Sequence, residues 1–120
     1  MESRILLVDD DRLLREVIGD FLSAHGLEVD LAEDATHALA KFEQGKYQLA
    51  LIDLVMPGMN GLELMQKIME EDANIFCLIM TGYPTVDSAY KAMVEGASDY
   101  IIKPFQLNEL VAAIKQHLES

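Results

Sequence analysis

Residues 5–11 read Ile5-Leu6-Leu7-Val8-Asp9-Asp10-Asp11, a short apolar run followed directly by carboxylates. A continuous apolar run of this length predicts a strand that is buried on both faces, as in a parallel sheet covered by helices. A second run, Leu49-Ala50-Leu51-Ile52-Asp53, has the same form and also ends in a carboxylate. Together the two stretches predict a parallel α/β sheet that carries acidic residues at the ends of its strands.

Strand-like and helical patterns alternate along the chain. Apolar residues recur at helical spacing from Leu13 to Leu22, and Gly26 then marks the end of a helix. Asn60, followed three residues later by Glu63, predicts a capping box at the start of another helix. Further strands are predicted at 27–31, 75–80 and 99–102, and further helices at 35–42, 61–69, 85–93 and 107–118. Five strands alternating with five helices predict a doubly wound α/β fold, a three-layer sandwich around a parallel sheet.

Composition limits the classes of function. With 120 residues, of which 51% are hydrophobic, the chain is expected to form one packed domain over residues 1–120. No apolar run is long enough to cross a bilayer, so we expect no membrane contact. The net charge of −12 would repel phosphate backbones, which argues against direct nucleic-acid binding by this domain. The single cysteine, Cys77, cannot form an internal disulfide, and a cytoplasmic location is expected.

Polar side chains follow four of the predicted strands at the point where each strand ends. They are Asp9, Asp10 and Asp11 after the first strand, Asp53 after the third, Thr81 after the fourth and Lys103 after the fifth. Because parallel strands point the same way, these residues should gather at one edge of the sheet, where ligands bind in such folds. Asp11 also suits the N-cap of the following helix, which leaves Asp9 and Asp10 as the pair that can bind a metal ion.

The predicted cluster suits metal-assisted phosphoryl transfer. Several neighbouring carboxylates need either raised pKa values or a bound divalent cation. A donor set made of oxygens, without His or Cys, favours Mg²⁺ or Mn²⁺. An aspartate such as Asp53 can form an acyl phosphate, while Lys103 offers positive charge and Thr81 a hydroxyl to the phosphoryl oxygens.

In this order, the motifs resemble those of the receiver domain of bacterial two-component response regulators. They are residues 5–11, Asp53-Leu54-Val55-Met56-Pro57-Gly58-Met59-Asn60-Gly61, Met80-Thr81-Gly82, and Asp99-Tyr100-Ile101-Ile102-Lys103-Pro104-Phe105. The resemblance covers essentially the whole chain and implies a CheY-like, flavodoxin-like (βα)5 fold with strand order 2-1-3-4-5. Residues 81–105 also look like the receivers of NtrC-type transcription activators.

This resemblance implies a role for each acid. Asp53 corresponds to the phosphoacceptor of the family. A magnesium ion would be held by Asp53, by Asp10 directly, by Asp9 through a bound water, and by the backbone carbonyl of Val55.

The resemblance also implies the residues that sense the phosphoryl group. Thr81 and Lys103 would contact it, and the bond between Lys103 and Pro104 is expected to be cis. Tyr100 would be an aromatic switch that swings inward when Thr81 is drawn toward the phosphate.

Partners follow from the same resemblance. The phosphoryl donor would be a sensor histidine kinase or a phosphotransfer protein. The signal would leave through the face of the fourth helix, fifth strand and fifth helix, to an output domain outside this chain or to a second copy, in control of transcription. The chain is expected to be a regulatory domain and not an enzyme, since it would catalyse only its own phosphorylation and dephosphorylation.

Two other functions fit part of the pattern. A Mg²⁺-dependent phosphohydrolase could use Asp53 as nucleophile, but it would need an acid where Val55 stands and an inserted cap over the substrate. An interaction module that never takes phosphate could share the fold, but such modules usually lose an acid or the lysine, and this chain keeps both.

Two positions predict a long-lived phosphorylated form. Val55 and Tyr83 lie two residues beyond Asp53 and Thr81, where they would flank the path of water to an acyl phosphate. Val55 has no side-chain group to orient an attacking water, and Tyr83 is bulky.

Overall fold

The structure, a computed structural model, describes residues 3–119. Its elements are β1 (Arg4–Val8), α1 (Arg12–Ala24), β2 (Glu28–Ala32), α2 (Ala35–Lys41), β3 (Leu49–Asp53), α3 (Gly61–Glu71), β4 (Phe76–Thr81), α4 (Val86–Val94), β5 (Asp99–Ile102) and α5 (Leu107–Glu119). The strands form one parallel sheet in the order β2-β1-β3-β4-β5. The predicted doubly wound fold and its strand order are therefore confirmed.

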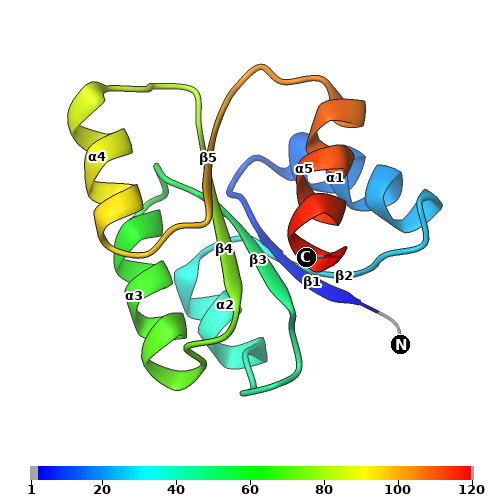
Figure 1. Cartoon of the computed structure of the whole chain (residues 1–120), viewed down its shortest axis with the longest axis horizontal. Coiled ribbons are helices and arrows are strands. Elements are labelled where there is room, and N and C mark those ends of the chain that lie inside the picture. Colours follow the sequence, from blue (N-terminus) through cyan, green and yellow to red (C-terminus); the bar gives the residue numbers. More distant parts are fainter. Residues whose placement is uncertain (1–2, 120) are drawn as a thin grey trace.

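Helices cover both faces of the sheet (Figure 1). Helices α1 and α5 lie on one face, and α2, α3 and α4 lie on the other. The central strands are the most deeply buried, because Ile5–Val8 and Leu49–Ile52 have no exposed surface. Burying each of their Val, Leu and Ile side chains stabilises the fold by about 1.5–3 kcal/mol. Among residues 3–119, no helix combines the length and the apolar character that crossing a bilayer requires.

Caps fix where the helices begin relative to the strand ends. The Asp11 carboxylate accepts a hydrogen bond from the Leu14 N–H at 3.2 Å, so α1 starts directly after the acidic run. Asn60 and Glu63 form the predicted capping box of α3. Such caps are each worth about 1 kcal/mol. Both helices therefore start close to the carboxyl edge of the sheet, which we define as the edge formed by the carboxyl ends of the strands.

Helix α4 differs from the other long helices in what it buries. Its Val86, Tyr90 and Met93 are 90%, 69% and 50% exposed, and within this helix Ala92 is the buried residue. Helical spacing predicted the helix correctly but could not show which neighbour would cover it. Since β5 ends the sheet, α4 lies over the margin of the sheet and keeps an apolar face in solvent.

Candidate functional site

The carboxyl ends of β1 and β3 bring three acids together. The two strands are neighbours, with Val8 paired to Ile52, so that Asp9 and Asp53 follow at the same level. One carboxylate oxygen from each of Asp9, Asp10 and Asp53 lies within 4.8 Å of the other two. Asp9 is fully buried and Asp53 is 5% exposed, whereas Asp10 is exposed. The structure thus places three of the predicted metal ligands at one point of the carboxyl edge.

Lys103 reaches this cluster from β5. Its ammonium Nζ lies 2.9 Å from Asp9 Oδ2 and 3.4 Å from Asp53 Oδ1. The Lys103 N–H donates to the Thr81 carbonyl at 2.8 Å, which holds its backbone beside the end of β4. The bond between Lys103 and Pro104 is cis, as expected. Burial opposes the charge of Lys103, but its hydrogen bond to Asp9 and the attraction of both carboxylates outweigh burial and raise its pKa.

The cluster carries more negative than positive charge. Three carboxylates share one ammonium group. Burial and the nearby charge of Asp9 raise the pKa of Asp53 to about 6, although Lys103 acts in the opposite direction. A carboxylate that is costly to ionise in this way is relieved by a bound cation, and the all-oxygen donor set suits a hard cation such as Mg²⁺.

Asp9 is held by contacts that the sequence pattern did not reveal. Its Oδ1 accepts the N–H of Asp11 at 2.9 Å, and its Oδ2 accepts from Lys103. The Arg15 guanidinium, one turn into α1, donates to the Asp9 carbonyl at 2.7 Å. Both Asp9 carboxylate oxygens are therefore already bonded to protein groups, and Arg15 fixes the backbone of the same residue.

A cavity of about 360 Å³ opens over these side chains. Its lining consists of Asp9, Asp10, Asp11, Asp53, Val55, Gly82, Tyr83 and Lys103. Val55 and Tyr83 are 51% and 75% exposed, so they form its outer rim. The cavity joins acids, lysine and the two predicted rim residues in one solvent-accessible site.

Gly61 allows α3 to begin directly against Asp53. A Cβ at this position would clash with the main-chain carbonyl of Asp53. The Gly61 N–H also donates to the Leu54 carbonyl at 2.9 Å. Any larger residue would push the start of α3 away from the end of β3. Gly61 is thus a structural requirement of the site that lies outside the predicted site residues.

Thr81 and Tyr100 are not among the residues that line the acidic cavity. Thr81 is fully buried, and its Oγ1 accepts the N–H of Tyr83 at 3.0 Å. Tyr100 is half-buried on β5, and its hydroxyl lies 2.7 Å from the Oγ of Ser88 on α4. The structure therefore places Tyr100 with α4 and not with the acids, and Ser88 is a contact that the sequence analysis missed.

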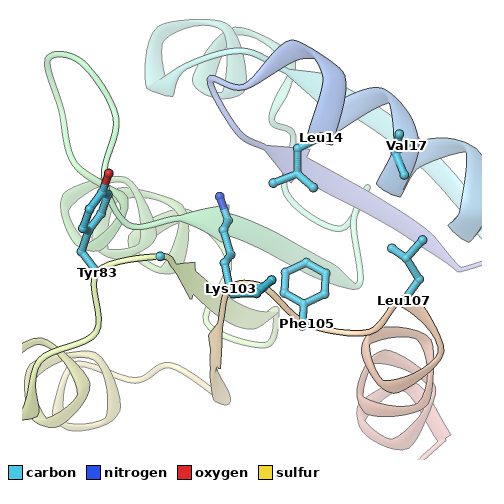
Figure 2. Close-up of a pocket in the computed structure, with 8 residues that line it drawn as sticks. Leu14, Val17, Tyr83, Lys103, Phe105 and Leu107 are labelled. Carbon is cyan, nitrogen blue, oxygen red and sulfur yellow. The ribbon is translucent and has the colours of Figure 1, made fainter.

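An apolar groove adjoins the acidic cavity (Figure 2). It has a volume of about 600 Å³ and is lined by Leu14, Val17, Gly82, Tyr83, Lys103, Pro104, Phe105 and Leu107. Leu14 and Val17 come from α1, Phe105 lies in the loop before α5, and Leu107 is the first residue of α5. The groove and the cavity share Gly82, Tyr83 and Lys103, so a molecule seated in the groove lies beside the acids.

The fold and the site together identify the class of protein. The chain belongs to the response regulator receiver domain family, which it matches over residues 5–115. Response regulator protein FleR of Pseudomonas aeruginosa is 38% identical over 117 residues, which cover 98% of this chain and 25% of FleR. Transcriptional regulatory protein TrcR of Mycobacterium tuberculosis is 34% identical over 112 residues, covering 93% of this chain and 44% of TrcR.

A solved structure supports the same assignment. The CheY-like response regulator receiver domain protein from Methanospirillum hungatei superposes with a TM-score of 0.94 at 34% identity, covering 99% of this chain and 95% of that one. The chain spans less than half the length of FleR and of TrcR. The family places the chain in two-component signalling, while the similarity to NtrC-type activators stays a prediction.

Proposed function

We propose that this chain is a phosphorylation-dependent switch in which Asp53 accepts a phosphoryl group with the help of Mg²⁺. The observation that carries the proposal is the meeting of three carboxylates with one lysine at the carboxyl edge of the sheet. This arrangement leaves negative charge that a divalent cation would neutralise, and it presents Asp53 to the cavity beside a positively charged group.

The residues present fit a magnesium ion with distinct roles. Asp10 is exposed and has room to be a direct ligand, as does Asp53 at the end of β3. The two oxygens of Asp9 are engaged by Asp11 and Lys103, which favours contact through a metal-bound water. The carbonyl of Val55, a residue of the cavity rim, would complete the protein ligands. When bound, the ion would neutralise charge on the phosphoryl oxygens.

In the proposed transfer, a carboxylate oxygen of Asp53 forms a bond to phosphorus as the bond from phosphorus to a histidine nitrogen of the donor breaks. The released imidazole keeps the bonding electron pair. Lys103, 3.4 Å from Asp53 Oδ1, would hold one phosphoryl oxygen, and the buried Thr81 hydroxyl would turn to donate to another. Positioning and charge neutralisation supply most of the rate in reactions of this kind.

The donor would be a sensor histidine kinase or a phosphotransfer protein. We expect it to cover the apolar groove, because the groove shares Gly82, Tyr83 and Lys103 with the acidic cavity and opens beside it. Leu14 and Phe105 would then bury apolar surface against the donor while its histidine faces Asp53.

The output surface would be the face of α4, β5 and α5. Val86, Tyr90 and Met93 on α4 and Ile102 on β5 are all at least half exposed, which is costly unless a partner covers them. An output domain or a second copy is the expected partner. Control of transcription is the expected outcome, in line with the relative TrcR, which is a transcriptional regulatory protein. The domain would catalyse only its own phosphorylation and dephosphorylation.

Acetyl phosphate, a small phosphoryl donor, tests the proposal directly. With Mg²⁺ it should add one phosphoryl group to the wild-type chain and none to Asp53→Asn, as measured by intact mass. Asp30→Asn, a change on β2 in a different polar network, should be phosphorylated like wild type. Modification of Asp53→Asn at the wild-type level would contradict the proposal.

A separate assay tests the alternative of a phosphohydrolase. Sustained turnover of a generic phosphoester, with Mg²⁺ and without accumulation of phosphorylated protein, would favour that alternative. Val55 argues against it, because no acid stands at that place on the cavity rim.

A further inference from the structure

Ser88 links the N-terminal cap of α4 to Tyr100 on β5, a contact that the sequence alone does not predict. It is the third residue of α4, and its main-chain N–H donates to Thr85 Oγ1 at 2.9 Å. Its own hydroxyl accepts the Thr85 N–H at 3.3 Å, which completes the capping box of the helix. The same hydroxyl lies 2.7 Å from the hydroxyl of Tyr100 on β5.

The hydrogen-bonding capacity of a serine hydroxyl is sufficient for all of these contacts. Ser88 Oγ has one proton and two acceptor positions. It donates to the Thr85 carbonyl at 3.2 Å and accepts from the Thr85 N–H, which leaves one acceptor position for the Tyr100 hydroxyl. One arrangement that satisfies all three contacts has Tyr100 as the donor to Ser88, with every bonding position of Ser88 filled.

We propose that Ser88 is a positioning residue that holds the ring of Tyr100 inward and joins it to the N-terminal cap of α4. The Tyr100 ring packs against the core cluster on that face of the sheet, so the bond keeps the ring at the buried side of α4. The cap residue Thr85 is linked by a short loop to Tyr83, whose N–H is bound by Thr81. Thr81, through this loop, and Tyr100, through Ser88, are therefore both linked to the first turn of α4.

The consequence for signalling rests on the proposed function. If Thr81 turns toward a phosphoryl group with the Tyr100 ring inward, the Ser88 bond stabilises that arrangement and raises the affinity for a phosphoryl mimic. Because α4 buries little apolar surface, one hydrogen bond at its cap is a large share of what holds its first turn. A residue at this place can tune the switch without touching the acids.

The first test needs no phosphate. Incorporated 3-fluorotyrosine gives four ¹⁹F resonances, which Tyr→Phe variants assign to Tyr47, Tyr83, Tyr90 and Tyr100. We expect Ser88→Ala to shift or broaden the Tyr100 resonance and leave that of Tyr47 in place. Ser88→Thr, which keeps the hydroxyl, should restore the wild-type position. An unmoved Tyr100 resonance in Ser88→Ala overturns the tether.

The second test uses beryllofluoride with Mg²⁺ as the phosphoryl mimic. Ser88→Ala and Tyr100→Phe should each weaken its apparent affinity about two- to tenfold, the range expected for one hydrogen bond. The double variant should be no weaker than the weaker single variant, because both changes break the same bond. Ser98→Ala and Tyr47→Phe, the same kinds of change at residues outside this bond, should bind like wild type.

Additive losses, or wild-type affinity in both single variants, would overturn the coupling to the switch. Failure of the wild-type chain to bind beryllofluoride would instead count against the proposed function. In that case the ¹⁹F measurement on the ligand-free protein still decides whether Ser88 holds Tyr100.

Discussion

The two edges of the sheet carry polar networks of opposite character. At the amino edge, formed by the amino ends of the strands, the Arg4 guanidinium contacts Glu28 at 2.5 Å and Asp30 at 3.2 Å. Lys46 lies 3.9 Å from Asp30, and the Tyr47 hydroxyl donates to Asp30 at 2.7 Å. Two acids thus meet two basic side chains, and their charges balance.

At the carboxyl edge, three carboxylates meet a single lysine. Desolvation is costly for charges that are not paired, and the raised pKa of Asp53, about 6, reflects that cost. The balanced network needs nothing more and is a structural clamp. The unbalanced one is completed by a cation and a phosphoryl group, so the difference in charge balance separates a structural site from a functional one.

The largest expected effect comes from removing the lysine that contacts the carboxylates of Asp9 and Asp53 at the carboxyl edge. Lys103→Ala should slow phosphorylation of Asp53 by acetyl phosphate about 100-fold, the loss typical of an electrostatic group that stabilises developing charge. Lys46→Ala, which removes a lysine from the amino edge, should leave that rate unchanged. Equal rates for Lys103→Ala and wild type, measured by intact mass over time, would remove the functional distinction between the edges.

Stability should change in opposite directions at the two edges. The pKa of Asp53 rises from 3.8 to about 6 on folding, so ionising this carboxyl destabilises the folded state. The loss of folding free energy is absent below pH 3.8, grows as the pH rises, and is complete above pH 6. Without metal at pH 8, Asp53→Asn should therefore raise the free energy of unfolding by about 2 kcal/mol. Asp30→Asn should lower it by about 1 kcal/mol, through its weakened bonds to Arg4 and Tyr47.

Urea unfolding at pH 5 and pH 8 measures both changes. The advantage of Asp53→Asn should shrink at pH 5, where the wild-type carboxyl is mostly protonated. A destabilised Asp53→Asn at pH 8 would show that the carboxyl edge is balanced after all.

A smaller effect is expected from the uncharged rim of the acidic cavity. Val55 and Tyr83 are exposed there and offer an attacking water little orientation. Val55→Asn combined with Tyr83→Glu should speed loss of the phosphoryl group about tenfold, through better positioning of that water. The decay of phosphorylated protein after removal of the donor gives the rate, and an unchanged rate would refute the predicted long lifetime.

Much of this architecture follows from local sequence. The apolar runs at residues 5–8 and 49–52 predict buried parallel strands, and strand polarity then brings Asp9 and Asp53 to one edge. That these strands are neighbours followed from the strand order that the family resemblance implied. The caps at Asp11 and Asn60 were also predictable, since they depend on residues three positions apart. These features rest on short-range patterns or on the direction of the chain.

The remaining features depend on contacts across the fold. The bonds of Arg4 to Asp30 and of Ser88 to Tyr100 join residues 26 and 12 positions apart, which no periodicity marks. The exposure of one side of α4 could not be predicted for a related reason: apolar spacing identifies an apolar face of a helix but not whether another element covers it. Arg15 could have been noticed as a basic residue one turn after the acidic run.

Titration with Mg²⁺, followed by the amide resonances of the uniformly labelled chain, tests the central claim most directly. The account predicts saturable changes centred on residues 9–11 and 53–55, with the amides of Arg4, Glu28 and Asp30 unmoved and the response lost in Asp53→Asn. A spectrum that stays unchanged on adding Mg²⁺, or that changes equally at both edges of the sheet, would contradict it.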